Sequence, residues 1–372
     1  GQDPNAYGNT TDLNWMAGSQ YVYSFGKCIF MPADLTAGIE FNQDKLEDNM
    51  WGYHRTVDQK VNIGSAFFQN EWKNEHWGFL IGGRLDKHNL IDHVIFSPRA
   101  NLRYNPTENI NLRFSYSSGF RAPQAFDEDL HVENVGGNVA MVELADNLKE
   151  ERSQSLSASA DIYHRFGAFQ VNFLVEGFYT KLSDVFALTD GEVVDGILTR
   201  TRYNAPGARV MGLTLEGKMA YLTKFQVQAG VTLQQSHYSE PHVWNKEAPA
   251  VKKMMRTPNT YGYFTATYTP IKPLSIALSG TYTGSMLVPH EPVPGFLEKP
   301  ITVNTKDFFD IGLKAAYDFK LYKSMNLQVN AGVQNIFNAY QNDFDKGADR
   351  DSGYIYGPSL PRSFFAGVKI SY

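Results

Sequence analysis

The sequence lacks several features that would place it in common protein classes. It has one cysteine, Cys28, in 372 residues, which excludes an intramolecular disulfide framework and a cysteine-based zinc cluster. It has no run of about 18 apolar residues, which excludes transmembrane helices. Only 20% of residues are charged, with 34 basic against 39 acidic side chains and a formal net charge of -5. A disordered chain and a nucleic-acid-binding surface are therefore poor interpretations.

The first residues carry no targeting signal. Residues 1–9 are polar, do not begin with Met, and contain neither the charged nor the apolar region of a signal peptide. We therefore expect the native start of the gene product, and any export signal, to lie upstream of this sequence.

Aromatic residues and glycine, in contrast, are abundant. The chain contains 21 Tyr, 25 Phe and 31 Gly, a composition that favours pleated strands and tight turns over long helices. The clearest pattern has a period of two, as expected when successive side chains point to opposite faces of a sheet. From Phe225 to Gln234, for example, Phe, Val, Ala, Val and Leu alternate with Gln, Gln, Gly, Thr and Gln.

About fifteen segments show this alternation and are predicted to be strands. Many are longer than ordinary globular strands and reach the roughly 9 to 11 residues that cross a bilayer at a tilt. Their approximate spans are residues 15–25, 33–43, 58–72, 77–87, 96–105, 110–120, 152–164, 168–187, 207–221, 224–238, 258–269, 274–287, 307–320, 326–340 and 361–372.

The links between these segments alternate between short and long. Short links contain turn residues, as in residues 105–108 and 270–273. Outer-membrane barrels have short periplasmic turns and long extracellular loops, whereas a soluble sandwich has no reason to sort its links in this way. We therefore predict that the long links are extracellular. They lie near residues 44–57, 88–95, 121–151, 188–206, 239–257, 288–306 and 341–360.

The last segment fits the same orientation. Phe364, Ala366, Val368, Ile370 and Tyr372 form one apolar face that ends on an aromatic residue. The alternative is a soluble β-sandwich or β-propeller, but the sequence has no repeat of about 40 residues of the kind that propeller blades show. The predicted fold class is all-β, as a transmembrane antiparallel up-and-down β-barrel.

Three stretches of the chain resemble sequence signatures of one family. Residues 114–124 read Phe-Ser-Tyr-Ser-Ser-Gly-Phe-Arg-Ala-Pro-Gln, and residues 148–153 read Leu-Lys-Glu-Glu-Arg-Ser. Residues 332–338 and 356–362, followed by the aromatic end, have the character of a last hairpin. In this order and spacing they resemble the C-terminal part of the β-barrel of a Bacteroidetes-like TonB-dependent outer-membrane receptor.

The resemblance implies a 22-stranded barrel with an N-terminal plug, of which this chain holds about 15 strands. Residues 1–14 would be the tail of an extracellular loop and residues 15–372 the C-terminal part of the barrel. The plug, the TonB box and about seven strands would be missing from this chain. An open 15-stranded sheet would be unstable in a bilayer, because unpaired backbone groups in hydrocarbon cost several kcal/mol each.

The implied function is energised uptake, across the bacterial outer membrane, of a scarce large nutrient such as a ferric siderophore, haem, cobalamin or another metal complex. The implied partners are the TonB complex, the missing plug and N-terminal strands, a small-molecule or metal-chelate ligand, and outer-membrane lipid. A surface lipoprotein is an open alternative partner. We expect no cofactor and no nucleic acid.

Two other functions remain as alternatives. One is a passive outer-membrane pore, or a ligand-binding surface barrel without TonB coupling. The other is a barrel hydrolase, although the sequence contains no compact catalytic signature such as Gly-x-Ser-x-Gly or His-Glu-x-x-His. We therefore predict no enzyme and no catalytic residue.

Histidines are the candidate ligand contacts. Seven of the nine lie at predicted extracellular ends of strands, where neutral imidazole could contact a metal chelate or haem. The simpler interpretation is that polar residues belong in hydrated loops. The seven are His54, His88, His93, His131, His237, His242 and His290.

Three further charge patterns allow both a functional and a structural interpretation. The acidic link 121–151 could hold a cation, and the basic link 239–257 could attract an anionic ligand or lipopolysaccharide phosphate, but either could be a solvated charge run. A set of aspartates offers oxygen ligands for Ca²⁺, although its spacing departs from an EF-hand loop. These are Asp343, Asp345, Asp349 and Asp351.

Charged residues within the predicted strands are expected to face the lumen, because a charge on the lipid face costs roughly 2 to 4 kcal/mol at the bilayer midplane. We expect them to pair with one another or to bind the plug. They are Arg99, Arg103, Arg113, Glu176, Glu216 and Lys218.

Overall fold

The computed structural model describes residues 7–126, 129, 133–135, 138–322, 324–347, 349–358 and 360–372. These residues form twenty β-strands and one short 3-10 helix, η1 (Trp51–Tyr53). Within this part of the chain, no helix has the length and apolar character needed to cross a membrane.

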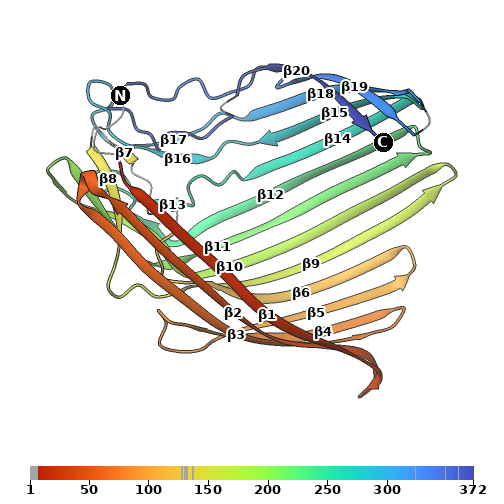
Figure 1. The fold of residues 1–372 in the computed structure, drawn as a ribbon, viewed down its shortest axis with the longest axis horizontal. Coiled ribbons are helices and arrows are strands. Elements are labelled where there is room, and N and C mark those ends of the chain that lie inside the picture. The colour runs from red at the N-terminus through yellow and green to blue at the C-terminus, as the bar shows by residue number, and fades with distance from the viewer. Residues whose placement is uncertain are drawn as a thin grey trace.

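Fifteen of the strands are long and form one continuous sheet (Figure 1). They are β1 (Asn9–Cys28), β2 (Met31–Met50), β3 (Arg55–Lys73), β4 (Trp77–His88), β5 (Ile95–Thr107), β6 (Ile110–Arg121), β9 (Glu151–Phe166), β10 (Phe169–Val194), β11 (Ile197–Tyr221), β12 (Phe225–His242), β14 (Thr260–Ile271), β15 (Leu274–Thr283), β18 (Phe308–Lys320), β19 (Asn326–Gln334) and β20 (Ser363–Ser371).

Five short strands lie within the long links. Three of them, β7 (Glu133–Val135), β8 (Asn138–Leu144) and β13 (Val251–Lys253), join the large sheet and bring it to 18 strands. The other two, β16 (Leu287–His290) and β17 (Ile301–Asn304), form a separate two-stranded sheet. All five gather at the end of the sheet where the long links lie, on the left of Figure 1. We call this the long-link end and the opposite one the short-turn end.

The large sheet is an antiparallel meander. Each long strand pairs with the next long strand along the chain, so that β6 pairs with β9, β12 with β14, and β15 with β18. The exception to antiparallel pairing is β8, which runs parallel to the start of β11. In the described residues, β1 pairs only with β2 and β20 only with β19, so the sheet has two free edges.

The fifteen predicted strands are confirmed, but two predicted long links are wrong. Residues 44–57 are mostly strand, with η1 and His54 as the whole link between β2 and β3. Residues 188–206 are likewise a strand hairpin in which β10 and β11 are separated by residues 195 and 196 alone. β1 also begins at Asn9, before the predicted start at residue 15. In each case the strand continues beyond the apolar alternation, because backbone pairing does not need an apolar face once both faces are hydrated.

The two faces of the sheet differ as predicted. One row across five strands, fixed by the pairing register, contains apolar and small residues on the outward face: Phe114, Ala158, Gly177, Leu213 and Leu233. The neighbouring row on the opposite face consists of Ser115, Ser157, Phe178, Gly212 and Gln234, of which three are polar. The apolar outward residues are exposed in the isolated chain, as lipid-facing residues must be.

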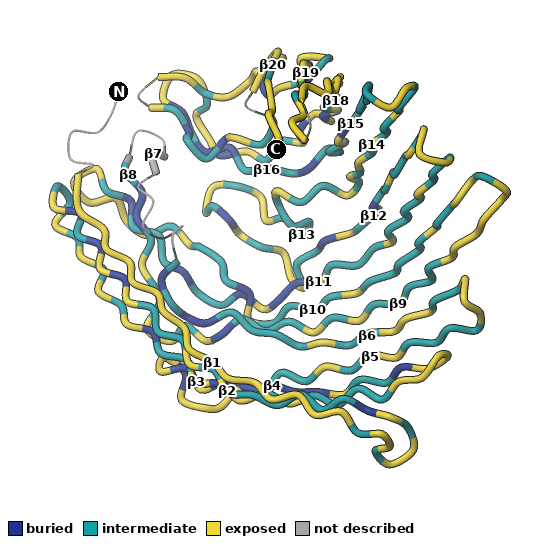
Figure 2. Tube along the Cα trace, turned by 45° about the vertical axis from the view of Figure 1, so that its right-hand side comes forward, coloured by how far each residue is buried: buried dark blue, intermediate teal, exposed yellow. Residues whose placement is uncertain are grey.

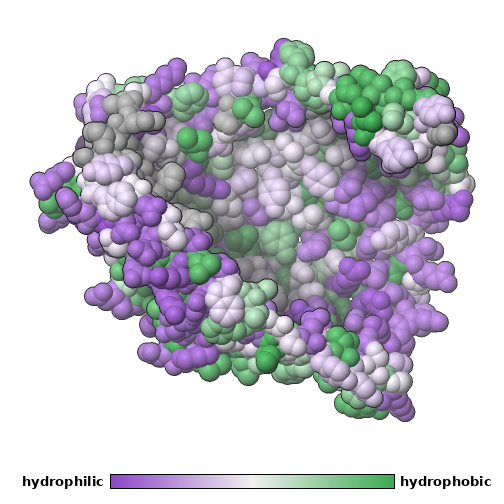
Figure 3. All heavy atoms as spheres, viewed as in Figure 1, coloured by the Kyte–Doolittle hydropathy of each residue, from purple (hydrophilic) through white to green (hydrophobic). Residues whose placement is uncertain are grey.

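Burial is concentrated at one end of the molecule. Figure 2 shows most of the buried residues near the long-link end, whereas the short-turn end is largely exposed. The buried apolar cluster of Met286, Val288 and Tyr354 also lies there, packed against Val303 and Tyr356. Figure 3 shows the molecule hollowed on the side that carries β1 at its front, with many hydrophilic residues around the hollow. The core of this chain is thus formed by the links, and not between layers of the sheet.

Candidate functional site

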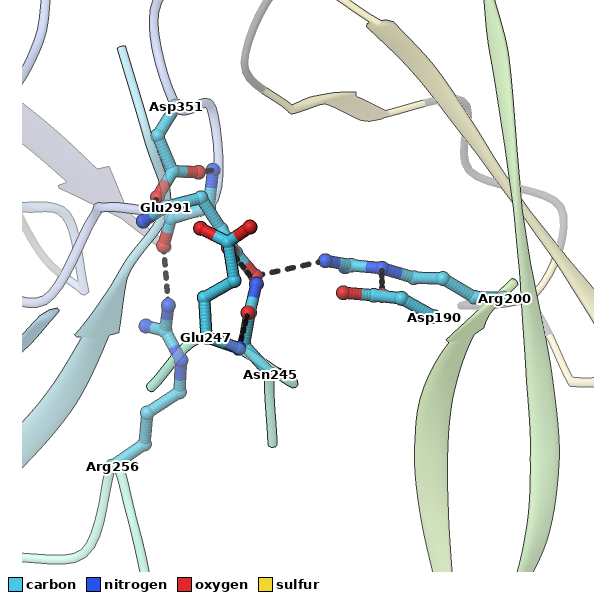
Figure 4. A network of polar contacts seen from close by, with 8 residues as sticks. Asp190, Arg200, Asn245, Glu247, Arg256, Glu291 and Asp351 are labelled. Atoms are coloured by element: carbon cyan, nitrogen blue, oxygen red, sulfur yellow. Dashed lines mark hydrogen bonds and ion pairs between the residues drawn. The ribbon is translucent and has the colours of Figure 1, made fainter. Parts of the chain in front are cut away.

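Three links and the β10–β11 hairpin meet in a polar network at the long-link end (Figure 4). Its centre is Glu291, which directly follows β16 and is 7% exposed. Arg200 on β11 donates hydrogen bonds to Asp190 on β10 at 3.0 Å and to Glu291 at 3.0 Å. Asn245, in the link between β12 and β14, donates to the second Glu291 oxygen at 2.8 Å.

The network continues into the link between β19 and β20. Asp351 accepts hydrogen bonds from the backbone N–H of Glu291 at 2.9 Å and of Gly353 at 2.8 Å. Arg256, from the same link as Asn245, donates to the carbonyls of Gly353 and Ile355. The β10–β11 hairpin and the links that follow β12, β15 and β19 are therefore held to one another by charged and amide side chains.

The environment of Glu291 is unfavourable for its negative charge. Burial, together with the nearby carboxylates of Asp190 and Asp351, raises its pKa to about 7, although Arg200 and Asn245 oppose the shift. The Glu291 carboxyl group therefore changes protonation near neutral pH, at the point where the three links and the β10–β11 hairpin meet.

An aromatic and acidic cluster adjoins this network. The rings of His290 and Tyr354 stack at 3.7 Å between centroids with an interplanar angle of 6°. His290 Nε2 lies 2.9 Å from Asp345 Oδ2, and the hydroxyls of Tyr354 and Tyr356 both donate to Asp343. Burial and the Asp343 charge raise the pKa of Tyr354 to about 12 and also raise the pKa of Tyr356. Both phenols stay protonated and hold the link in place.

The acidic link between β6 and β9 has its own anchor. Asp129 is 1% exposed and forms an ion pair with Arg202 at 2.6 Å. The Arg202 guanidinium also lies over the rings of Phe126 and Phe186, at 5.7 and 5.8 Å from their centroids. Arg121, from the Gly-Phe-Arg-Ala-Pro stretch, lies 4.2 Å from the Phe126 centroid. Asp129 thus belongs to a buried contact rather than to a solvated charge run, and Asp127 and Glu128 lie outside the described residues.

A third contact joins the link after β4 to the start of β9. His93 Nε2 lies 3.1 Å from Glu150, which also accepts hydrogen bonds from Arg152 at 2.8 and 3.0 Å. Burial alone would raise the pKa of Glu150, but the bonds from Arg152 and from its own backbone N–H lower it overall. Glu150 therefore stays ionised and fastens both links.

The histidines predicted as ligand contacts differ in burial and in their hydrogen-bond partners. His88 and His290 are buried, at 0% and 5% exposed, and each has a protein partner: Gln124 for His88 and Asp345 for His290. His54 and His93 are exposed, and His237 and His242 are half-buried. Burial lowers the pKa of His88 and His242, which keeps both rings neutral at pH 7. His131 lies outside the described residues. The described histidines do not converge on one point.

Three of the four aspartates of the last link have partners of their own within the protein. Asp343 accepts from two tyrosines, Asp345 bonds His290 and the backbone N–H of Asp351, and Asp349 is exposed. Among the residues that the structure describes, no group of three or more His, Cys, Asp or Glu is arranged to hold a metal ion.

The strand charges lie on the inward face, as predicted. Glu216 forms an ion pair with Lys218 at 2.8 Å and accepts a hydrogen bond from Tyr263. Arg84, which the sequence analysis did not single out, bonds Glu40 and Asp86 at 2.7 Å each. The concave face therefore presents paired charges and hydroxyl groups, the surface expected of a hydrated lumen.

Sequence reasoning missed the Figure 4 network as a unit. Arg200 and Glu291 are 91 residues apart, and Asn245 and Glu291 are 46 apart. No local motif connects them, so only the fold brings them together. At the long-link end, charged and amide side chains therefore hold the links together beside the polar inward face of the sheet.

The sequence matches one protein-family model, and the fold matches several solved structures. The family model described as "TonB dependent receptor-like, beta-barrel" matches residues 1–336. A ferric enterobactin receptor (PfeA) variant from Pseudomonas aeruginosa, solved with enterobactin, is 18% identical with a TM-score of 0.71, over 98% of this chain and 55% of that one.

Two other solved structures give a similar result. The siderophore receptor PirA of Pseudomonas aeruginosa is 14% identical with a TM-score of 0.68, over 97% of this chain and 57% of that one. The ferric-catecholate import receptor Fiu of E. coli K12 is 14% identical with a TM-score of 0.69, over 97% of this chain and 55% of that one.

This chain spans about half the length of the solved structures it matches. No protein of curated function matches the sequence. Since the family model covers most of the chain, the sequence match and the meander of long strands lead to one conclusion. The chain belongs to the TonB-dependent receptor-like β-barrel family of the bacterial outer membrane.

Proposed function

We propose that the protein containing this chain actively imports a ferric siderophore, with a catecholate chelate as the first candidate. The family match over residues 1–336 carries the proposal. The solved structures with the same fold are siderophore receptors, and they supply the catecholate class of ligand as a candidate.

We assign different tasks to the two ends of the sheet. The ligand enters at the long-link end, which we assign to the extracellular side, and passes along the paired charges of the inward face. Exposed His54, and half-buried His237 and His242, are the histidines that we assign to ligand contact. Exposed His93 already bonds Glu150, and buried His88 and His290 hold the links, because a ring nitrogen of each is bonded within the protein.

The partners in this proposal are a plug, additional N-terminal strands and the TonB complex. The free edges of β1 and β20 support the need for more strands, since unpaired strand edges are not tolerated in hydrocarbon. A plug that fills the lumen would close the passage until TonB supplies work. A ligand-binding or surface lipoprotein partner is not needed for this mechanism.

Uptake of radioactive ⁵⁵Fe carried by enterobactin tests the proposal in cells whose only catecholate receptor is the full-length protein. We expect accumulation that stops when a protonophore collapses the proton-motive force. Binding at 0 °C should persist under the same treatment, because capture does not need energy.

The main alternative, a passive pore, gives a different result. Uptake would then continue after protonophore treatment and would scale with solute size rather than with chelate chemistry. Ferric citrate, haem and cyanocobalamin serve as the comparison solutes. Energy-dependent uptake of one of these solutes instead of ferric enterobactin would support active transport but would show that the ligand is not a catecholate chelate.

A further inference from the structure

The β10–β11 hairpin extends beyond the strands on either side of it. β10 pairs with β9 only as far as Ser183, and β11 pairs with β12 only from Ala208 onward. Residues 184–207, between these points, pair with each other as two antiparallel strands joined at residues 195 and 196. Short β8 adds a parallel strand along the outer part of β11. We call residues 184–207 the arm.

The base of the arm has an irregular backbone on both of its strands. Asp184 has a φ of 54° and Gly207 a φ of 140°, positive values that most residues avoid. A Cβ added at Gly207 would lie 2.6 Å from the Leu182 carbonyl oxygen, so this position needs glycine. Pro206, next to it, has no N–H to donate to the ladder. A hinge consists of a few such positions at the end of a regular element, and the base of the arm has this geometry.

One face of the arm carries two arginines. Arg200 and Arg202 are two residues apart on β11, so their side chains leave the same face of the strand. At about 3.3 Å per residue, their Cα atoms lie about 7 Å apart. Both side chains are largely buried, with exposed fractions of 13% and 6%. They therefore contact other parts of the protein rather than solvent.

The two arginines hold different links. Arg200 bonds Glu291 at 3.0 Å, and Figure 4 shows it reaching from the arm toward the three links of that network. Arg202 bonds Asp129 at 2.6 and 2.8 Å, in the link between β6 and β9. A single segment of β11 is therefore fastened to the β6–β9 link on one side and to the Figure 4 network on the other.

We propose that the arm couples these two groups of links, so that the β6–β9 link opens and closes together with the links after β12, β15 and β19. The ladder of the arm is regular from Val185 to Asp190, so a swing about the base moves Arg200 and Arg202 together. Each anchor holds the arm in the position that the other anchor requires, and loss of one weakens the other. Such coupling is reciprocal by thermodynamic necessity. Its use in admitting a ligand rests on the proposed function, but the coupling itself needs no ligand.

The test measures hydrogen exchange by mass spectrometry in the full-length protein in detergent, without ligand, at one pH and temperature. Arg202→Met releases the β6–β9 link from the arm, and the measured segment is residues 284–307 on the other side. We expect exchange there to become at least about five-fold faster, the lower end of the usual range for coupled sites. The reverse variant, Arg200→Met, should likewise accelerate exchange of residues 138–150. β9 and β10 should keep their protection in both variants, because the sheet stays folded.

Two matched controls replace arginines that, among the described residues, bond these links but not the arm. Arg55 on β3 donates to two carbonyl groups of the β6–β9 link. Arg55→Met should change exchange of residues 284–307 by less than about two-fold, as expected of independent sites. Arg256 donates to two carbonyl groups of the link between β19 and β20, and Arg256→Met should leave exchange of residues 138–150 equally unchanged.

A double variant distinguishes coupling from two separate effects. Once Arg200→Met has released the arm from Glu291, the addition of Arg202→Met should cause little further acceleration at residues 284–307. Asp129→Asn releases the second anchor from the side of the link and replaces Arg202→Met if that variant does not fold. It should accelerate exchange of residues 284–307 as well.

Three results would overturn the proposal. These are unchanged exchange of residues 284–307 in both Arg202→Met and Asp129→Asn, equal acceleration of this segment by Arg55→Met, and full additivity in the double variant. The experiment contains neither a ligand nor an energy source, so its failure would leave the proposed transport function untouched.

Discussion

The two ends of the sheet are built in different ways. At the short-turn end, β9 and β10 are joined by residues 167 and 168, and β11 and β12 by residues 222–224, with mostly exposed surroundings. At the long-link end, segments up to 91 residues apart are joined by buried charges. The short-turn end can form from backbone hydrogen bonds between residues that are close in sequence. The long-link end forms only when the fold brings distant segments together.

The difference teaches where this molecule can change shape. Strand ladders and tight turns are insensitive to single side chains, but a fastened set of links depends on a few buried charged groups. The following variants test this contrast, beginning with the largest expected effect.

Breaking the buried Asp129–Arg202 pair should have the largest effect. Arg202→Met removes the partner of a carboxylate that is 1% exposed, and breaking a buried pair in this way costs about 3–5 kcal/mol. Hydrogen exchange should show that the link between β6 and β9 loses protection while β9 and β10 keep theirs. The control Lys272→Met, at the short-turn end, should change stability by less than about 0.5 kcal/mol. Equal protection of this link from hydrogen exchange in both variants would show that the Asp129–Arg202 pair does not hold the link in place.

The Figure 4 network should be more stable at acidic pH. The pKa of Glu291 is raised to about 7 in the folded protein from 4.5 when exposed, so the folded state binds more protons between these values. The free energy that keeps the links closed therefore rises as the pH falls from about 7 to about 4.5, and falls again as the pH rises through this window.

Glu291→Gln sharpens this test because its side chain resembles the protonated acid. Compared at each pH, so that intrinsic exchange rates cancel, the variant should protect residues 284–307 better than the unaltered protein at pH 8. The two proteins should be alike at pH 5. A constant difference at both pH values would show that Glu291 does not titrate in this range.

His290→Ala should have an intermediate effect. It removes the stack on Tyr354 and one of the two hydrogen bonds that Asp345 accepts, and a hydrogen bond to a charged group contributes about 1.5–3 kcal/mol. Limited proteolysis should cleave the link between β19 and β20 faster. His54→Asn provides the control, since His54 is exposed with a φ of 51° that Asn tolerates. Faster cleavage of this link in both variants would show that the loss of the His290 contacts is not the cause.

The smallest effect is expected at a short turn. Gly167 has a φ of +57° in the turn between β9 and β10, and Gly167→Ala should cost about 1 kcal/mol because a Cβ is disfavoured in the left-handed region. Gly177→Ala, also open around its Cβ but without positive φ, should cost less. Urea unfolding in detergent micelles compares the two. Equal losses of unfolding free energy in the two variants would show that the positive φ of Gly167 does not contribute to the stability of the short-turn end.

Much of the sheet could be predicted from the sequence. Period two identifies all fifteen long strands, since lipid outside and water inside impose alternation wherever a strand crosses the membrane. The same reasoning failed at residues 188–206, where both faces are hydrated and alternation ends although pairing continues.

The site could be predicted only in part. Histidines at strand ends were identified from parity, but burial of His88 and His290 was not, because it depends on links folding over them. Arg200 and Glu291 carried no signal in the sequence, because an ion pair between distant segments leaves no periodicity in the chain.

The orientation of the two ends is the central claim, and thiol labelling in intact cells tests it most directly. The full-length protein has Cys28 at the short-turn end, and Glu192→Cys adds an exposed thiol at the tip of the β10–β11 hairpin. A membrane-impermeant polyethylene-glycol maleimide should modify the Glu192→Cys thiol in intact cells. It should reach Cys28 only after the outer membrane is permeabilised. Labelling of Cys28 alone in intact cells would place the long-link end inside and contradict the account.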